Sequence, residues 1–483
     1  MQSLHSRNHR WDGRGDECIR MHLSPRPSQR GENASHRPLT ALARARRRAR
    51  ISNQPREGVE KMKIAIEGCC HGELDAIYAA IAHLETVEGV KIDLLICCGD
   101  FQAVRNLDDL ECMSVPDKYK ELGTFYKYYS GEKTAPIPTL FIGGNHEASN
   151  YLWELYYGGY VAPNIYYVGH SGVINFGDLR IGGLSGIYKF HDYKKGHHER
   201  PPYTGHAVKT AYHVREFDVF KLKQVQGDID VFLSHDWPRG IAQFGNKHEL
   251  FRKKKFLKEE IESNTLGSPP AEELLKKLKP KYWFSAHLHV KFAALVKHED
   301  EKTTKFLALD KCLPHRDFLQ VVDLPAKSAE GGFSLDEEWL SILKANHEYH
   351  SVTHSPAQLP AYGTPEAVEI ESHRQWVRER LEAVGSSSRT PPDFVATRPA
   401  HDPSTETRRR GRAPSNVDAN PQTQALMELL ELDLKITANS GNGGDGGDVQ
   451  YYGVPRRGPF GAAPPRRAPP PPPKVADPDE IEL

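Results

Sequence analysis

Five short apolar runs in this chain of 483 residues each end at, or next to, a cluster of metal-binding residue types. In chain order the clusters are Gly68-Cys69-Cys70-His71-Gly72, Gly99-Asp100-Phe101-Gln102, Gly143-Gly144-Asn145-His146-Glu147, Ser234-His235-Asp236 and Ala286-His287-Leu288-His289. In α/β sheets, sites gather at the carboxyl ends of strands, because loops converge there while the strands stay rigid. The set is enough to hold two metal ions around one shared carboxylate, a common device for in-line displacement at a phosphate ester.

The apolar pattern between residues 62 and 343 predicts alternating strands and helices. Nearly continuous apolar runs predict buried strands over residues 63–67, 92–98, 139–142, 229–233 and 282–285. Apolar residues at helical spacing predict a helix over 74–88. Shorter antiparallel strands joined by glycine turns are expected over residues 165–168, 172–176 and 179–184. We therefore expect an α/β fold, a layered sandwich of two sheets with outer helices.

The two ends of the chain are rich in Arg, Pro, Gly and Ser, and such composition does not build a core. We expect residues 1–61 to be a disordered basic extension and residues 385–483 to be a disordered tail. The Arg-rich runs 43–50 and 408–412 suit nuclear import or loose attraction to RNA. Both ends are expected to be dispensable for chemistry, so that a fragment over 62–384 should keep full activity.

Two segments near the C-terminus have helical patterns. Residues 365–384 predict one helix, capped by Thr364 and ended by Gly385. Its side chains that could dock on the core are Val368, Trp376, Leu381 and Val384. Residues 424–434 form a short amphipathic island, either a docking helix or a transient helix with no partner.

The overall composition bounds the compartment. Seven cysteines, an odd number, and no secretory signal point to a reducing nuclear or cytosolic environment. No apolar stretch approaches the roughly 18 residues that span a bilayer, so we expect no membrane partner. The formal net charge is zero, which hides local basic patches and does not exclude an anionic partner.

The residue types within the clusters suggest distinct roles. Asp100 can bridge two cations, although an Asp at this place can also cap a helix. His287 and His289 flank one residue, so on an extended segment both imidazoles face the same side. Asn145 would ligate through its amide oxygen, which frees His146 to donate a proton to a leaving oxygen. Glu147 would then orient His146 or lie at the surface, and His235 would complete the second metal site.

This ordered set resembles the calcineurin-like metallophosphoesterases, which have a four-layer α/β/β/α sandwich. The resemblance implies that His71 and His289 bind a first metal ion with Cys69, and that Asp100 bridges. It further implies a second ion at Asn145, His235 and His287, with His146 acting on the transition state. The chain departs from the family pattern by Cys69 in place of Asp and by Ala286 in place of Gly. A thiolate is softer than a carboxylate and favours Zn(II) or Fe(II) over Mg(II), and Mn(II) remains a third possibility.

Longer segments narrow the resemblance to the RNA lariat debranching enzymes. The matching segments are 68–75, 98–106, 128–133, 141–150, 185–188, 199–203, 234–240, 283–289 and 309–320. They imply a catalytic domain over 62–305 and a family-specific C-terminal region over 306–384. They also imply hydrolysis of the 2′-5′ phosphodiester at the branch of an excised intron lariat, with branched RNA as the partner, in the nucleus, by a monomer.

The same resemblance makes residues 188–203 the segment that recognises the lariat, here called the recognition loop. Its cationic and aromatic side chains suit phosphates and unpaired bases, although an ordinary solvated loop can share this composition. The candidate RNA-contacting residues are Tyr188, Lys189, His191, Tyr193, Lys194, His197, His198, Arg200 and Tyr203, with Phe190 and Lys195 among them in sequence.

Two other functions compete with this prediction. A protein Ser/Thr phosphatase would show Asp in place of Cys69 and an Asp-Arg-Gly where this chain has Gln102-Ala103-Val104. A catalytically dead RNA-binding adaptor would have lost several ligands, whereas only Cys69 deviates here. Protein partners, if any, would bind the C-terminal tail.

Overall fold

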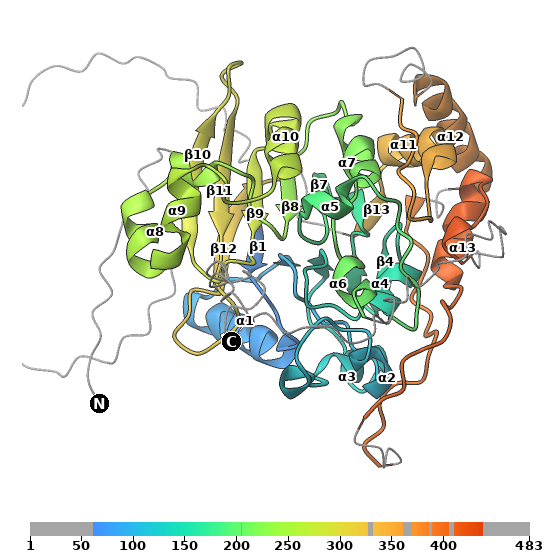
Figure 1. The fold of residues 1–483 in the computed structure, drawn as a ribbon, viewed down its shortest axis with the longest axis horizontal. Coiled ribbons are helices and arrows are strands. Elements are labelled where there is room, and N and C mark those ends of the chain that lie inside the picture. Colours follow the sequence, from blue (N-terminus) through green and yellow to red (C-terminus); the bar gives the residue numbers. More distant parts are fainter. Residues whose placement is uncertain are drawn as a thin grey trace, which may run out of the picture. The chain divides into compact units, whose positions relative to one another are not determined.

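The computed structural model describes residues 61–203, 205–326, 332–360, 370–385, 389–404 and 410–437 (Figure 1). The basic extension 1–60 lies outside the described residues, as do Thr364, Val368 and the tail from residue 438 onward. No helix within the described ranges has the length and apolar character needed to cross a membrane.

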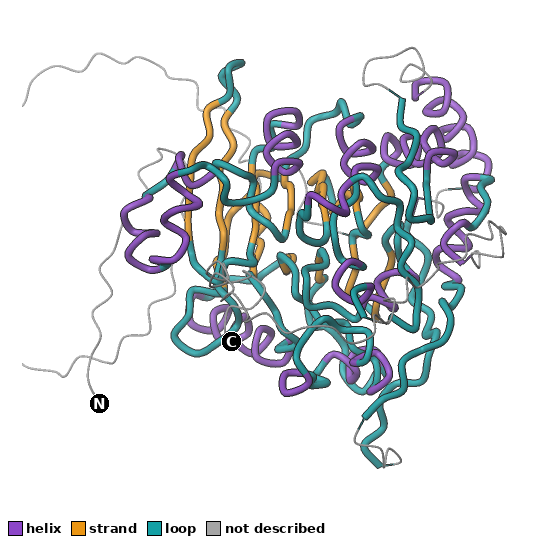
Figure 2. The backbone as a smooth tube through the Cα atoms, viewed as in Figure 1, coloured by secondary structure: helices purple, strands orange, loops and turns teal. Residues whose placement is uncertain are grey.

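Two β-sheets form the centre of the fold (Figure 2). The six-stranded sheet has the order β12 (Leu319–Pro325), β1 (Lys61–Glu67), β2 (Leu94–Cys97), β3 (Thr139–Phe141), β5 (Ile165–Tyr167) and β4 (Gly159–Ala162). The seven-stranded sheet has the order β10 (Phe292–Lys297), β11 (Thr303–Ala308), β9 (Tyr282–Ser285), β8 (Val231–Ser234), β7 (Leu179–Leu184), β6 (Ser171–Phe176) and β13 (Phe333–Leu335). Strands β1, β2, β3 and β5 are parallel, as are β7, β8, β9 and β11.

Helices cover the outer faces of the sheets. They are α1 (Leu74–Glu88), α2 (Leu107–Leu110), α3 (Phe125–Tyr129), α4 (Ser149–Glu154), α5 (Phe190–Tyr193), α6 (Ala207–Thr210), α7 (Glu216–Lys223), α8 (Lys247–Lys253), α9 (Lys258–Glu262), α10 (Pro269–Leu278), α11 (Glu337–Asn346), α12 (Ile370–Val384) and α13 (Pro421–Leu430). Helix α1 and strands β7 and β9 have the predicted bounds, and the other predicted strands differ by one or two residues at an end.

Three apolar clusters hold the layers together. One cluster lies between the two sheets and joins residues such as Ile64 and Ile96 of the first sheet with Ile181 and Leu233 of the second. A second cluster joins α1 to the other face of the first sheet. The third joins α7, α10, α11 and α13 to the outer face of the second sheet. The four-layer α/β/β/α sandwich is therefore confirmed.

The C-terminal part corrects the prediction of a disordered tail from residue 385. Helix α13 buries Leu426, Met427 and Leu430 in the largest apolar cluster. Residues 389–404, here called the strap, lie against α3, where the Tyr129 hydroxyl accepts hydrogen bonds from the Thr397 and Arg398 amides. The composition misled because the strap is held by these polar contacts and by single apolar residues such as Phe394, whose ring centroid lies 5.4 Å from that of Tyr129, and neither forms a periodic hydrophobic pattern.

Helix α12 docks in part as predicted. Leu381 is buried, Trp376 packs against the same cluster, and the ammonium of Lys344 lies 3.7 Å from the Trp376 ring centroid. Val384 is 50% exposed, so its predicted docking is wrong. Val377, which the pattern did not single out, is buried in its place.

Candidate metal centre

The five predicted clusters begin at, or within two residues after, the carboxyl ends of β1, β2, β3, β8 and β9. Since β1, β2 and β3 are parallel neighbours, and so are β8 and β9, each sheet delivers its polar loops to one edge. The sheets pack face to face, which brings the two sets of loops together. The five clusters, which are far apart in the sequence, therefore lie together in one site.

The first group of candidate ligands is Cys69, His71, Asp100 and His289, whose ligand atoms all lie within 4.8 Å of one another. The Nε2 atoms of His71 and His289 are 3.4 Å apart. The thiol sulfur of Cys69 accepts a hydrogen bond from the His287 backbone N–H at 3.3 Å. Cys69 therefore lies where a ligand to this group would lie.

The second group contains Asn145, His235 and His287. His235 Nε2 lies 3.2 Å from Asn145 Oδ1 and 3.4 Å from Asp100 Oδ1. The rings of His235 and His287 have centroids 5.0 Å apart. The other carboxylate oxygen, Asp100 Oδ2, lies 3.7 Å from His71 Nε2 in the first group. Asp100 thus presents one oxygen to each group.

The protonation states fit cation binding. Burial lowers the pKa of His71 to about 4, that of His287 to about 3 and that of His289 to about 2. Burial opposes ionisation of Asp100, but the adjoining His235 holds the pKa of that carboxyl well below its ordinary value. At neutral pH His71, His287 and His289 therefore offer uncharged imidazole nitrogens, which with the buried carboxylate make a donor set for divalent transition metals. Burial opposes the charged form of His235, but the adjoining Asp100 carboxylate raises the pKa of His235 above its ordinary value.

Burial also raises the pKa of the Cys69 thiol well above its ordinary value. A coordinating cation is the usual reason for a buried thiol to ionise. The donor chemistry therefore fits a metal centre at both groups.

Backbone conformations at the site are unusual. His71, Asp100, Gln102, His287 and His289 all have φ between 46° and 63°. Non-glycine residues rarely adopt this left-handed region, and its cost is tolerated mainly at functional sites. The turns aim the side chains of the ligands inward.

Two glycines permit the close approach of these loops. A Cβ atom at Gly99 would lie 2.1 Å from His235 Nδ1, and one at Gly144 would lie 2.2 Å from Asp100 Oδ1. No side chain larger than hydrogen fits at either position without moving a candidate ligand.

Gly144→Ala is accordingly expected to displace Asp100 and to lower turnover by about 100-fold, the size of effect that a shift of about 1 Å can cause. Metal content measured on the purified variant should fall with activity. Gly332→Ala is the matched control, because a Cβ there meets no atom of the described residues within 4 Å and the backbone is outside the left-handed region. If Gly144→Ala keeps its metal and its rate, the close approach has no functional weight.

Several residues that the sequence did not single out hold the ligands. The Cys98 carbonyl lies 2.9 Å from His235 Nδ1 and accepts its proton, which turns Nε2 toward Asn145. The Gln102 amide lies 3.2 Å from His71 Nδ1. Gln102 was part of a quoted motif, but only the structure shows its contact with a ligand.

The two alternatives considered for Glu147 are both wrong. Its carboxylate is buried and accepts hydrogen bonds from the backbone N–H groups of Phe101, Gln102 and Gly144 at 2.8, 2.8 and 2.9 Å. No bond to His146 is formed. Glu147 joins the loop after β2 to the loop after β3, and it could not be identified because its partners are backbone groups from distant segments.

His146 stands apart from both ligand groups. Its backbone N–H donates to Asp100 Oδ1 at 2.9 Å, and its ring centroid lies 5.6 Å from that of His71. Its Nδ1 atom is buried and has no hydrogen-bond partner among the described residues. The imidazole is therefore held beside the candidate metal ligands with a nitrogen to spare.

The recognition loop has an exposed part and a buried part. Phe190 is 83% exposed and His191 and Lys194 are also exposed, while the side chains of Tyr188 and Lys189 are half-buried. The rings of Tyr188 and Tyr193 have centroids 5.4 Å apart. These residues form the surface that the loop presents to solvent.

The predicted RNA contacts at His197 and Tyr203 are corrected, because both side chains are buried. His197 Nε2 pairs with Asp218 at 2.7 Å. Arg200 lies 4.4 Å from the Trp153 ring centroid and donates to the carbonyls of His197 and Glu199, so it too supports the loop. A loop pattern in sequence does not distinguish its outward from its inward side chains.

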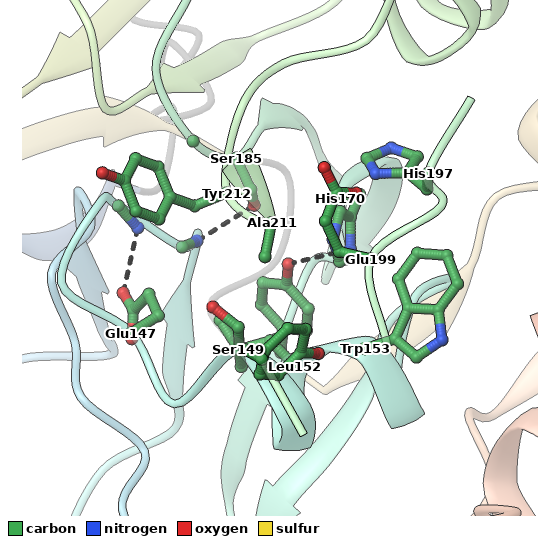
Figure 3. Close-up of a pocket in the computed structure, with 15 residues that line it drawn as sticks. Glu147, Ser149, Leu152, Trp153, His170, Ser185, His197, Glu199, Ala211 and Tyr212 are labelled. Carbon is green, nitrogen blue, oxygen red and sulfur yellow. Dashed lines mark hydrogen bonds between the residues drawn. The ribbon is translucent and has the colours of Figure 1, made fainter. Parts of the chain in front are cut away.

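The buried part of the loop encloses a small cavity (Figure 3). Its volume is about 30 Å³, with Glu147, Trp153, His170, His197 and Glu199 in its lining. That volume holds about one or two water molecules and is too small for a nucleobase. The cavity lies inside the support of the loop, between it and the Gly143-Gly144 turn.

Comparison with known proteins agrees with this architecture. Residues 62–291 match the family model of calcineurin-like phosphoesterases, and residues 301–435 match that of the lariat debranching enzyme C-terminal domain. The fold and site therefore define a metallophosphoesterase of the calcineurin-like class, whose members use divalent metal ions. The C-terminal match ends beyond α13, which agrees with the docking of that helix.

Similar curated proteins identify the family more closely. Lariat debranching enzyme A of Xenopus laevis is 53% identical over 385 residues, covering 78% of this chain and 72% of that protein. The lariat debranching enzyme of Arabidopsis thaliana is 52% identical over 372 residues, 77% of this chain and 86% of that protein. The lariat debranching enzyme of Homo sapiens is 53% identical over 386 residues, which cover 78% of this chain and 70% of that protein. The chain belongs to the lariat debranching enzyme family.

Proposed function

We propose that this protein is a metal-dependent phosphodiesterase that hydrolyses the 2′-5′ bond at the branch of lariat RNA and releases linear RNA. The observation that carries this function is the placement of Asp100 between two groups of candidate ligands, in a chain of this family. Both candidate sites face the same buried carboxylate, which suits two ions acting on one phosphate.

We assign the first ion to Cys69, His71 and His289 and the second to Asn145, His235 and His287, with Asp100 shared. Such a pair supplies charge stabilisation at the phosphate and a water of lowered pKa. The thiol of Cys69 favours Fe(II) or Zn(II), with Mn(II) as the third candidate.

His146 is proposed to protonate the leaving 2′-oxygen. Support comes from its unpartnered Nδ1 and from its position outside both ligand groups. The backbone N–H bond to Asp100 fixes the start of its side chain relative to the shared carboxylate. A proton donor held in this way needs no movement of the metal ligands.

His146→Ala should lower turnover by at least ~100-fold, the lower end of general-acid effects, while metal stoichiometry stays unchanged. His83→Ala on the exposed side of α1 is the matched control and should have no effect. Loss of metal in proportion to activity would reassign His146 as a ligand.

The exposed part of the recognition loop is proposed to bind the branch nucleotide, with Phe190 as the stacking residue. Phe190→Ala should weaken binding of branched RNA by about 1–3 kcal/mol, the contribution of one base stacked on one ring. A small aromatic phosphodiester does not reach the loop, so the variant should hydrolyse it at a rate close to that of the unaltered protein. An equal loss on both substrates would mean that Phe190 supports the fold.

The function itself is tested with substrates of matched composition. Full-length protein supplied with divalent metal should cleave a branched 2′-5′ RNA and leave a linear 3′-5′ RNA intact. If both RNAs survive while a phosphoprotein is dephosphorylated, the protein is a phosphatase of another kind.

We also propose that the protein acts in the nucleus, where spliced introns are made, as a monomer whose C-terminal tail contacts protein partners. Fractionation of cells that express the tagged full chain tests the location. Light scattering on the purified protein tests the monomer.

A further inference from the structure

The loop after β11 lies against the first group of candidate ligands. Lys311 pairs with Cys69 in an isolated parallel β-bridge, and the Cys69 backbone N–H donates to the Asp310 carbonyl. The contact is close, since a Cβ atom at Gly68 would lie 2.1 Å from the Asp310 carbonyl oxygen. The motif of residues 309–320 is thereby placed beside the metal-binding loops, but the proposed chemistry assigns no task to its side chains.

Three cations gather on this side of the site. Lys311 and Arg316 come from the loop after β11, and Lys254 follows α8. Burial lowers the pKa of Lys254, and the neighbouring charges of Arg316 and Lys311 lower it further. Burial and the charge of Arg316 likewise lower the pKa of Lys311. Arg316 forms an ion pair with Asp310 at 3.3 Å. The ammonium groups of Lys254 and Lys311 have no carboxylate or hydrogen-bond partner among the described residues.

Apolar side chains border this cluster. Phe256 is 56% exposed, its ring centroid is 5.9 Å from the Lys254 ammonium, and Leu313 is 42% exposed. Cations without partners beside an exposed ring are the pattern of surfaces that hold single-stranded nucleic acid, in which phosphates meet the cations and a base stacks on the ring. We call Lys254, Phe256, Lys311 and Arg316 the second flank.

The second flank and the recognition loop approach the centre from different sides. Lys311 pairs with Cys69, which belongs to the first group of candidate ligands. On the other side, the Tyr188 backbone N–H of the recognition loop donates to Asp236 at 3.4 Å, next in sequence to His235 of the second group. In Figure 1, helices α8 and α9 lie at one edge, while α5 and α6 lie on the other side of β9 and β8. An RNA that crosses the metal centre from the recognition loop therefore arrives at the second flank.

We propose that the second flank binds the 2′-arm of the branched RNA, the strand that continues beyond the scissile phosphate. This inference rests on the proposed function. The scissile bond joins the 2′-oxygen of the branch nucleotide to the phosphate of that arm. If the recognition loop takes the branch nucleotide and the metal centre takes the phosphate, the rest of the arm leaves over Lys311, Lys254 and Phe256.

The test compares two branched RNAs that differ only in the 2′-arm, one with a single nucleotide and one with several. The variant is Lys254→Ala/Lys311→Ala in the full chain, and the control is Lys297→Ala on the exposed side of β10. The double variant should raise KM several-fold for the long arm alone and leave kcat unchanged. The slope of log Kd against log salt for the long-arm RNA should fall by about 0.7 for each phosphate contact removed.

Equal losses on both RNAs would overturn the inference, because the lysines would then act on the metal centre or the scissile phosphate. No loss on either RNA would also overturn it. A loss that depends on the length of the 5′- or 3′-arm would overturn the assignment of the 2′-arm.

Binding of a linear single-stranded RNA, followed by fluorescence anisotropy, separates this inference from the proposed function. If the unaltered protein cleaves no branched RNA, but the Lys254→Ala/Lys311→Ala variant binds the linear RNA more weakly than the unaltered protein, the proposed function is wrong and the second flank is still an RNA-binding surface. If the unaltered protein cleaves branched RNA and the double variant binds RNA as tightly as the unaltered protein, the proposed function stands and the inference about the second flank is wrong.

Discussion

Asp100→Ala is expected to abolish hydrolysis of branched RNA, with a loss of at least about 10³-fold, more than the removal of a single transition-state donor usually causes. The reason is that Asp100 presents Oδ2 to His71 and Oδ1 to His235, so one substitution disturbs both candidate metal sites. Metal analysis of the purified variant should show less than the full complement. Turnover is measured at saturating branched RNA with metal in excess.

The fold should survive this substitution, because the packed strands that carry the loops are unchanged. Asp323→Ala is a control carboxylate on β12, where it forms an ion pair with Lys63 at 2.8 Å. That variant should keep its metal and its activity. Full activity of Asp100→Ala after metal removal would contradict a shared carboxylate.

Truncation after residue 384 should unfold the protein or lower its free energy of unfolding by at least about 5 kcal/mol. The cut removes α13, whose Leu426, Met427 and Leu430 are buried, and burial of each such side chain contributes about 1.5–3 kcal/mol. This sum approaches the whole stability of many domains, about 5–15 kcal/mol. The sequence predicted that a fragment over 62–384 keeps full activity, whereas the structure leads us to expect that this fragment is unstable and inactive.

The strap adds a polar contribution to the same loss. Arg105 is fully buried, and its guanidinium donates to Asp109, Glu154 and the Thr397 hydroxyl of the strap at 2.8 Å each. The Thr397 hydroxyl in turn donates to Glu154. Removal of the strap leaves a buried charge network without one of its partners, which is costly in a low-dielectric interior.

Thermal unfolding of two fragments checks this account. A fragment that ends at residue 437 should melt near the full chain, and one that ends at 384 should not fold. In the full chain, Leu430→Ala should lower the free energy of unfolding by about 2–5 kcal/mol, whereas Val384→Ala, at a half-exposed position, should change it little. A stable, active 384 fragment would show that the strap and α13 are accessory.

The sheet core was predictable because each buried strand is a short apolar run with a polar cluster at its end. Leu94, Leu95, Ile96 and Cys97 of β2 are all buried, as a strand covered on both faces requires. Residue types in the clusters then limited the chemistry, and all the predicted ligand residues lie together in the structure.

Contacts between distant segments were less predictable. The support from Glu147 depends on three backbone N–H groups of two loops, and the anchoring of the strap depends on Arg105, 292 residues away from Thr397. Nor did composition reveal that His197 faces inward to Asp218. These arrangements arise from packing of the whole chain, and no local pattern encodes them.

The most direct test of the proposed function is to follow the oxygen atoms during cleavage of a branched RNA in water labelled with heavy oxygen. Hydrolysis at this centre predicts a linear RNA with a free 2′-hydroxyl at the former branch, and the label in the phosphate left on the 2′-arm. Mass spectrometry of the two products reads both positions. A label at the 2′-hydroxyl, a phosphate left at the branch, or cleavage of the 3′-5′ bonds would contradict the account.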